Sequence, residues 1–302
     1  MATLKGQNFR ILIRDGEEWK VIGMSTACTV NLTSNTESAS HKDVLGLAEM
    51  PTITSKNWSV SVESLDVADV AAMLTAIKNQ TLFNLMWDET ATADNQTAQQ
   101  VAFCRSGYAY LNDVTFNWND RENSTKSLQF TGSGPLVEQT GAETDVITVS
   151  NTFTKGQFVR LFLSADNTAA PVKVVAAAKQ LSMHISMSLE NATTKDTDGD
   201  WQVQEPTGLS YDITSNALVR SGDVISSSVQ AQALPDIEDI YEASAPVKFL
   251  IANVSGANQR TKGTTIVSGS VIVSQLAINA PNRQNADYTT TFTGFGPYTV
   301  GA

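Results

Sequence analysis

Cysteine and histidine are nearly missing from this sequence, which has two of each in 302 residues. Cys28 and Cys104 lie in separate apolar or strand-like segments, so we expect two buried free thiols and neither a disulfide framework nor a thiolate metal site. His41 and His184 have no carboxylate pair beside them in the sequence and are interpreted as surface residues. With so few candidates, Ser-His-Asp and Cys-His catalytic arrangements are not expected.

Glycine-rich phosphate loops and metal-binding motifs are missing as well. The segment Gly132-Ser-Gly134-Pro lacks a third glycine and does not open a helix. The acidic run from Asp196 to Asp200 is not an EF-hand, because the sixth and twelfth positions of such a loop would be Trp201 and Thr207. We therefore expect no enzyme activity, no cofactor and no metal site.

Charge is scarce and of one prevailing sign. Charged residues make up 17% of the chain, and 20 Lys and Arg against 31 Asp and Glu leave a net charge of −11. A chain without a basic patch is a poor candidate for binding nucleic acid by neutralising phosphates. There is no run of about 18 apolar residues and no apolar core of a signal peptide at the N-terminus, so we expect synthesis in a cytoplasm and no membrane segment.

An internal repeat is the main feature that is present. Residues 106–135 and 268–297 align without a gap at an offset of 162, with 10 identities in 30 positions. Unrelated stretches would match at about two of 30 positions, so we interpret the pair as an internal duplication. The shared residues that close each copy are Arg121, Phe130, Gly132 and Gly134 in the first, and Arg283, Phe292, Gly294 and Gly296 in the second.

Alternating apolar and polar residues predict six or seven antiparallel strands in each copy. We expect a mainly β protein with two tandem homologous β-sandwich or barrel domains, each with one flanking α-helix. The expected boundaries are 1–138 for the first domain, 139–152 for a linker and 153–302 for the second domain.

Each copy also carries one long polar segment and one helix. The polar segments, 34–55 and 190–208, are unusually long for loops in a compact domain, and their presence in both copies favours a functional role. The helices are expected over 66–78 and 235–241, from an acidic first turn and a helical spacing of apolar residues. Their apolar faces include Val67, Val70 and Leu74 in the first helix, and Ile237 and Ile240 in the second.

The order of these segments resembles the major tail tube proteins of long-tailed bacteriophages. In each copy a strand, a long loop, a strand led by Trp58 or Tyr211 and one helix precede a closing Ser-Gly, Asn-x-Arg-x-Asn and Phe-Thr-Gly-x-Gly-Pro. The Lys-Asp-x-x-Gly-x-Trp of residues 195–201 and the Gly-Leu-Ser-Tyr of 208–211 are similar to the loop and strand entry of that family.

The resemblance implies a virion structural protein of a phage or prophage, in tandem-duplicated form. Three chains would give the six domains of one ring, and stacked rings would form a hollow tail tube that conducts DNA without binding it specifically. Further partners would be the tape-measure, tail-terminator and tail-tip proteins. The helices would lie on the outer side and the long loops would reach the neighbouring ring, through His41, Lys42, Asp43, Lys195, Asp196, Asp198, Asp200 and Trp201.

Two other functions fit parts of the sequence. The tube protein of a contractile injection or secretion system shares the architecture, although such proteins are usually single-copy. A secreted carbohydrate-binding or adhesin β-sandwich would also be rich in Thr and Asn, but would be expected to carry a secretion signal.

Overall fold

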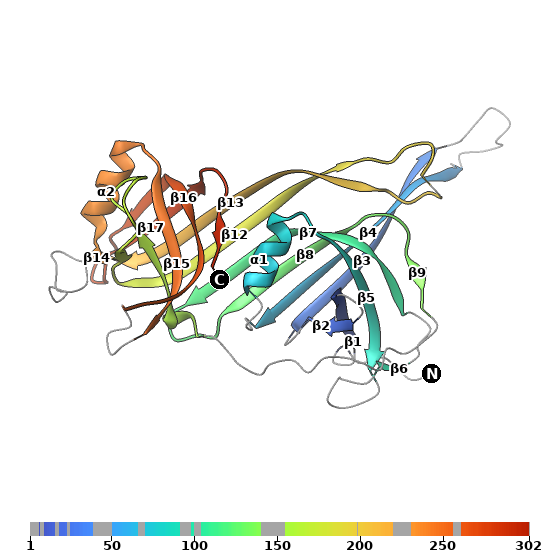
Figure 1. The fold of residues 1–302 in the computed structure, drawn as a ribbon, viewed down its shortest axis with the longest axis horizontal. Helices are drawn as coiled ribbons and strands as arrows, with labels where there is room; N and C mark the ends of the chain where they lie inside the picture. Colours follow the sequence, from blue (N-terminus) through green and yellow to red (C-terminus); the bar gives the residue numbers. More distant parts are fainter. Residues whose placement is uncertain are drawn as a thin grey trace.

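A computed structural model describes residues 6, 9–15, 18–22, 25–38, 50–65, 70–90, 98–99, 104–139, 155–197, 199–219, 231–255 and 261–301. The chain is mainly β and elongated, with two α-helices (Figure 1). Within the described residues, no helix is long and apolar enough to cross a membrane. The expectation of a mainly β fold with two flanking helices is confirmed.

In the described residues, the first half contains nine strands and one α-helix. Its elements are β1 (Phe9–Asp15), β2 (Glu18–Val21), β3 (Ser25–Ser38), β4 (Pro51–Leu65), α1 (Val70–Lys78), β5 (Leu82–Thr90), β6 (Ala98–Gln99), β7 (Arg105–Asn119), β8 (Thr125–Gly132) and β9 (Val137–Glu138).

As far as the structure describes it, the second half contains the same number of strands, one α-helix and a short 3-10 helix. Its elements are η2 (Gly156–Phe158), β10 (Val159–Leu163), β11 (Lys173–Val175), β12 (Ala178–Asn191), β13 (Gln204–Leu218), β14 (Ala231–Gln232), α2 (Leu234–Ala243), β15 (Val247–Ser255), β16 (Thr261–Asn279), β17 (Asp287–Gly294) and β18 (Thr299–Val300).

One antiparallel sheet runs through both halves. Hydrogen-bonded neighbours give it eight strands in the order β3-β4-β8-β7-β12-β13-β17-β16. A smaller sheet packs over each half, β2-β1-β5 in the first and β11-β10-β15 in the second. The long strands β7 and β16 belong to both layers, because their first parts pair with β5 and β15 and their later parts with β8 and β17.

The core lies between the large sheet and the two smaller ones. Alternate residues of the long strands point into it, and Val60, Phe130, Ile213 and Phe292 are all buried there. The small sheets are buried on their second face too, by a separate apolar cluster in each half. This two-sided burial explains why β10 and β15 read as continuous apolar runs rather than as alternating strands.

The strand pairings of the first half recur in the second. The seven pairings β1–β2, β1–β5, β3–β4, β4–β8, β5–β7, β7–β8 and β7–β9 have counterparts in β10–β11, β10–β15, β12–β13, β13–β17, β15–β16, β16–β17 and β16–β18.

Irregularities in the strands recur as well. The register of β7 against β8 shifts between Leu111 and Asp113, and that of β16 against β17 shifts between Val273 and Gln275, which is the sequence offset of 162. Both shifts in β3 recur in β12 at an offset of 153. The shift between Ser25 and Ala27 corresponds to the one between Ala178 and Gln180. The shift between Asn35 and Thr36 corresponds to the one between Ser188 and Leu189.

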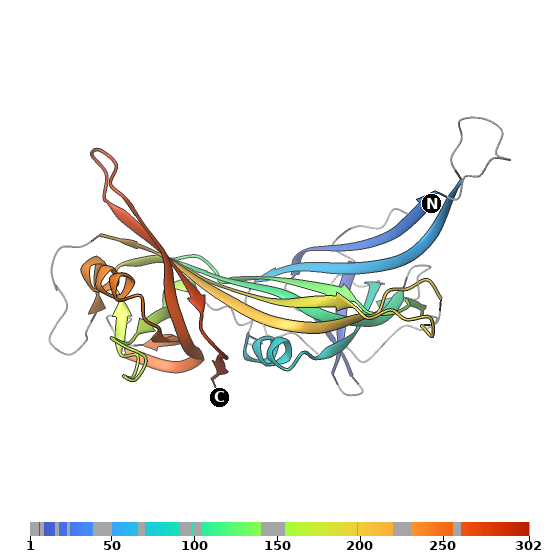
Figure 2. The ribbon, with the colours of Figure 1, turned by 90° about the horizontal axis from the view of Figure 1, so that it is seen from above.

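The two long polar segments are not loops over their whole length. β3 continues to Ser38 and β4 begins at Pro51, while β12 continues to Asn191 and β13 begins at Gln204. These extensions form two two-stranded ribbons. The β3–β4 ribbon projects from the molecule, whereas the β12–β13 ribbon runs alongside the first half (Figure 2). In the β3–β4 ribbon, residues 34–38 and 51–54 are exposed. Because neither face of this ribbon is buried, its sequence lacks the apolar alternation by which a strand is identified.

Two further expectations need correction or adjustment. Cys28 is half-exposed on an outer strand of the large sheet rather than buried, and its thiol is free, whereas Cys104 is buried as expected. The helices are α1 from Val70 and α2 from Leu234; the positions 66–69 expected in the first helix lie outside the described residues.

Candidate assembly interface

The two halves are joined by pairing between β7 and β12. Seven register pairs connect them, among them Leu181 with Trp118, Met183 with Phe116 and Ile185 with Val114. All six side chains are at most 3% exposed. The large sheet therefore crosses from one half to the other without a break in its ladder or in its apolar face.

One polar pair crosses the same junction on the other face of the sheet. His184 Nε2 lies 2.7 Å from Asp113 Oδ2, and the two side chains are 42% and 33% exposed. His184 is thus partly exposed, as expected, but it has a carboxylate partner that is 71 residues away in the sequence. Only the pairing of β7 with β12 brings the two side chains together.

The loop that ends the β12–β13 ribbon packs on the first half of the chain. Lys56 N donates to Asp200 O at 2.7 Å, and Gln202 N donates to Lys56 O at 2.9 Å. Gly134 N donates to Gln202 O at 2.8 Å. The Lys56 ammonium also lies 3.3 Å from Asp200 Oδ2 and 6.0 Å from the centre of the Trp201 ring. This loop is therefore held by a neighbouring unit of the same large sheet.

The helix α1 also contacts the second half. Tyr298 Oη donates to Leu74 O at 2.8 Å, and Tyr298 is 1% exposed. Lys78 Nζ lies 5.9 Å from the centre of the Tyr298 ring. Burial, and then the neighbouring Tyr211, raise the pKa of Tyr298. The hydroxyl is therefore a neutral donor that ties the helix of one half to the last strands of the other.

The large sheet has two edges that the described residues leave unpaired. At one end β3 pairs with β4 alone. At the other end β16 pairs with β17, but its opposite side is free within the described residues from Ile272 to Asn279. Figure 1 places α2 and β16 at one end of the molecule and the β3–β4 ribbon at the other.

Large apolar side chains lie exposed on both free edges. Leu32 on β3 is 61% exposed and Ile278 on β16 is 51% exposed. Val30 and Leu276 are only half-buried beside them. An open edge that carries exposed apolar side chains is a surface for pairing with another strand.

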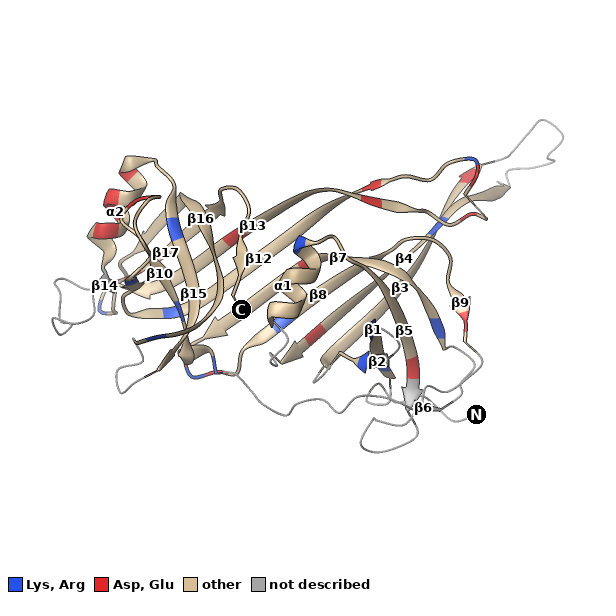
Figure 3. Cartoon of the chain, viewed as in Figure 1, with Lys and Arg blue, Asp and Glu red and all other residues tan. Residues whose placement is uncertain are grey.

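The face of the large sheet that points away from the core is polar and nearly free of cations. On its six central strands the outward residues include Ser59, Ser61, Glu63, Ser127, Gln129, Thr131, Asp113, Thr115, Asn117, Ser182, His184, Ser186, Ser210, Asp212, Thr214, Asn216, Thr289, Thr291 and Thr293. These residues hold three carboxylates and no lysine or arginine, and Figure 3 shows few charges along these strands. At the end of β17, Asp287 has the same alternation and lies 3.6 Å from Lys179 Nζ.

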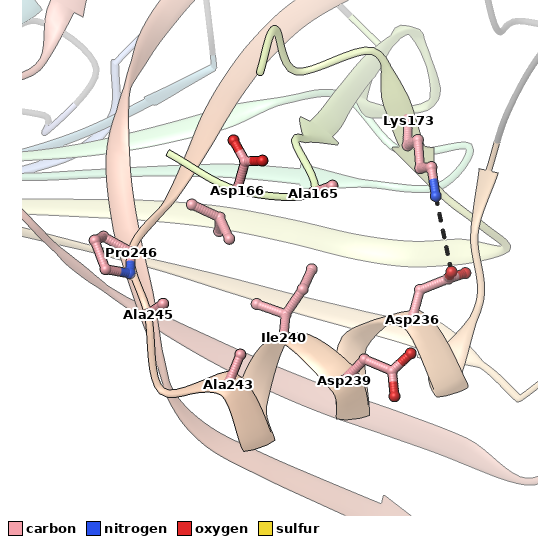
Figure 4. Close-up of a pocket in the computed structure, with 10 residues that line it drawn as sticks. Ala165, Asp166, Lys173, Asp236, Asp239, Ile240, Ala243, Ala245 and Pro246 are labelled. Carbon is pink, nitrogen blue, oxygen red and sulfur yellow. Dashed lines mark ion pairs between the residues drawn. The ribbon is translucent and has the colours of Figure 1, made fainter. Parts of the chain in front are cut away.

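A shallow hollow lies between α2 and the turn after β10 (Figure 4). Lys173 Nζ lies 3.9 Å from Asp236 Oδ1 at its edge. Hydrogen bonds from the Thr168 hydroxyl and from the backbone N–H groups of Ala169 and Thr168 hold the pKa of Asp166 below its usual value. The lining carries no histidine or cysteine, and within the described residues no three His, Cys, Asp or Glu side chains gather as metal ligands do.

The predicted residues belong to three sets: those that define the repeat, those of the helices and those of the expected inter-ring segments. Phe130 and Phe292 are core residues, while Arg121 and Arg283 are exposed turn residues with φ of 62° and 63°. The apolar helix residues Val70, Leu74, Ile237 and Ile240 are buried as expected. Of the expected inter-ring residues, Lys195, Asp196, Asp200 and Trp201 lie in the β12–β13 loop. His41, Lys42, Asp43, Val67 and Asp198 lie outside the described residues.

The sequence did not identify the residues of the internal junction as a site. Their alternation signalled buried strands, but a strand buried by its own domain and one buried by the next look alike in a sequence. One signal was available in the aligned repeat: Trp118 of the first copy corresponds to Ala280 of the second. A large side chain replaced by a small one at one place indicates that the two copies face different surroundings.

No family model matches the chain, and no curated protein does. Among solved structures, the tail of an empty gene transfer agent particle with C6 symmetry matches 48% of this chain and 95% of its own, at 13% identity and a TM-score of 0.36. The virion of a native gene transfer agent particle matches 49% of this chain and 99% of its own, at 13% identity and a TM-score of 0.36. The SPP1 tail tube matches 49% of this chain and 78% of its own, at 15% identity and a TM-score of 0.37.

Proposed function

We propose that the chain is a virion structural protein that closes into rings, three chains to a ring, and that stacked rings form the hollow tail tube through which DNA leaves a phage-like particle. The observation that carries this proposal is the eight-stranded sheet with one open edge at each end, β3 and β16. Leu32 and Ile278 are exposed on these edges, so pairing with another strand would bury apolar surface at each edge.

Ring closure satisfies both edges at once. The two edges belong to different strands, so the contact between chains is heterologous, and such contacts close into rings when the rotation between subunits permits. A closed barrel has no edge left on which to aggregate. Three chains contribute eight strands each, so the proposed barrel has 24 strands.

The polar face of the large sheet suits the inside of a DNA channel. The core and both small sheets occupy the other side, which leaves this face to line the bore. The outward residues named above are mostly hydroxyl and amide groups with Glu63, Asp113 and Asp212, and they offer a phosphate backbone no lysine or arginine to bind. DNA therefore slides past such a wall without being retained, and we expect the lumen to have a negative potential.

The recurring pairings and register shifts support the view that the halves are equivalent units of one ring. We keep the boundaries 1–138 and 153–302 as the proposed units, with 139–152 as the link between them. The ribbons β3–β4 and β12–β13 are the proposed contacts to the next ring, as well as to the neighbouring unit that Asp200 and Gln202 already touch. The tape-measure, tail-terminator and tail-tip proteins are the expected further partners.

Negative-stain electron microscopy of the concentrated protein tests this function. We expect rings or tubes of uniform bore, and we expect soluble double-stranded DNA not to co-sediment with them. A protein that stays monomeric at every concentration and binds a glycan would overturn the proposal in favour of an adhesin. A basic lumen in an assembled ring would overturn the conducting role.

A further inference from the structure

We infer that β3 of one chain pairs with β16 of a second copy in the register that β7 and β12 use within the chain. The inference rests on the proposed closure of the chain into rings, and it specifies the contact that makes it. It assigns Leu32 to Leu276, Val30 to Ile278 and Cys28 to Ala280 as facing residues.

The internal junction supplies the template. β7 uses one side for β5 as far as Tyr110, and the same side for β12 from Asp113 onward. β16 uses the corresponding side for β15 as far as Val271, and nothing in the described residues occupies it from there to Asn279. The site that β12 fills on the first half is thus present and open on the second.

The register follows from the matched irregularities of the strands. The shifts in β3 and β12 align these strands at an offset of 153, which makes Leu32 the counterpart of Ile185. The shifts in β7 and β16 align those strands at an offset of 162, which makes Leu276 the counterpart of Val114. Because Ile185 faces Val114, Leu32 is assigned to face Leu276.

Exposure of the counterparts agrees with a missing partner. Ile185 and Phe116 are fully buried in the internal junction, whereas their counterparts Leu32 and Ile278 are 61% and 51% exposed. Removing an apolar side chain from water is favourable, so a partner strand that covered either residue would be stabilised by it. The same strand positions are thus buried where the partner is present and exposed where it is absent, as two halves of one interface should be.

The junction between chains is built from different side chains than the one within the chain. Cys28 and Ala280 stand where Leu181 and Trp118 pack internally, and Asn31 and Gln275 stand where His184 and Asp113 form their polar pair. The contact between chains therefore buries less volume and holds no ion pair. Within each chain the internal junction is already closed. Among the described residues of the large sheet, only the edges β3 and β16 are then open to pair between chains.

Cysteine cross-linking tests the register. Cys28 is half-exposed and free, so the substitution Ala280→Cys places a second thiol opposite it in the neighbouring chain, within the Cα separation of about 4.4 to 6.8 Å that a disulfide needs. Burial raises the pKa of the Cys28 thiol, so oxidation with copper phenanthroline belongs at mildly alkaline pH. We expect covalent species of two and three chains on a non-reducing gel, and none larger if three chains close the ring.

Three controls make the result specific. Ala277→Cys lies on the same edge but on the other face, and should give only background cross-linking. Cys28→Ser combined with Ala280→Cys should abolish the product. Rings seen by microscopy without the cross-link would overturn the register and leave the proposed function intact, whereas cross-linked chains that never close would overturn the ring. No cross-link at the highest attainable concentration would overturn the inference.

A second pair of variants avoids any dependence on disulfide geometry. Leu32→Lys changes a side chain that is 61% exposed on the free edge, and Val172→Lys changes one that is equally exposed in the turn before β11. Both should leave the melting temperature of the single chain nearly unchanged. We expect only Leu32→Lys to abolish rings, and assembly that persists in this variant would contradict the inference.

Discussion

The indole ring of Trp58 fills the space that a side chain at Gly132 would need. A Cβ built on Gly132 would overlap the indole, and one on Gly107 would lie 2.7 Å from Trp58 Cζ2. Tyr211 has the same relation to the second copy, where a Cβ on Gly294 would lie 2.6 Å from Tyr211 Cε1. The glycines of the sequence repeat therefore leave the space into which one aromatic side chain packs in each half.

Adding a methyl group under this ring should destabilise the fold. Gly132→Ala forces the buried indole or the backbone of β8 to move, and overpacking of this kind costs about 1 to 3 kcal/mol. We expect a lower free energy of unfolding in urea titrations followed by tryptophan fluorescence. Gly208→Ala is the matched control, since a Cβ there meets nothing within 4 Å. Equal stability of the two variants would refute the packing role of Gly132.

Two buried tyrosines should respond in opposite ways to loss of the hydroxyl. Tyr298→Phe removes the hydrogen bond to Leu74 O and should cost about 1 kcal/mol. Tyr288 Oη is buried and has no partner among the described residues, so Tyr288→Phe should be neutral or stabilising by up to about 1 kcal/mol. Thermal unfolding of the two variants measures both effects, and an equal loss in each would show that the Tyr288 hydroxyl contributes as much as the hydrogen-bonded hydroxyl of Tyr298.

Alkaline pH should destabilise the chain through the same residues. Burial, and then the negative charge of Asp236, raise the pKa of Tyr288 to about 12. A pKa that is higher in the folded than in the unfolded state gives stability that is complete below about pH 10 and lost as the pH rises toward 12. Urea titrations between pH 9 and 12 measure this loss. The free energy of unfolding should fall less in Tyr288→Phe than in the parent chain, and the difference should be about 2 kcal/mol at most. Parallel pH profiles would contradict this assignment.

The buried ion pair between Arg10 and Asp88 should be sensitive to removal of one partner. Arg10 Nε lies 2.5 Å from Asp88 Oδ1, and the side chains are 3% and 2% exposed. Asp88→Ala leaves a buried guanidinium without this carboxylate and should cost about 3 to 5 kcal/mol. The double variant Arg10→Met with Asp88→Ala should be less destabilised than the single one, as chemical denaturation can measure. Additive costs would show that the two charges are not coupled.

The sequence was sufficient for features that depend on neighbours along the chain. Alternation located the core strands, and Phe130 and Phe292 lie in the core at equivalent places. The helical spacing of Val70 and Leu74 predicted a helix in the place where α1 is found. The sequence shows the glycines of the repeat. It does not show why they are glycines, because Trp58, which packs on Gly132, lies more than 70 residues earlier in the chain.

Features that depend on partners across the sheet were not predictable in this way. The β3–β4 ribbon has exposed residues on both faces, so it lacks the pattern by which a half-buried strand is identified. The pairing of His184 with Asp113 depends on which strand of one half meets which strand of the other. The exposed Leu32 is an ordinary core position by its sequence and becomes informative only when its buried counterpart Ile185 is known.

Native mass spectrometry of the smallest assembled species tests whether the chain closes into a ring of three. We expect a closed species with the mass of three 32.4 kDa chains, and larger species only in multiples of that mass. A closed ring with any other number of chains, or a chain that remains single at every concentration, would contradict it.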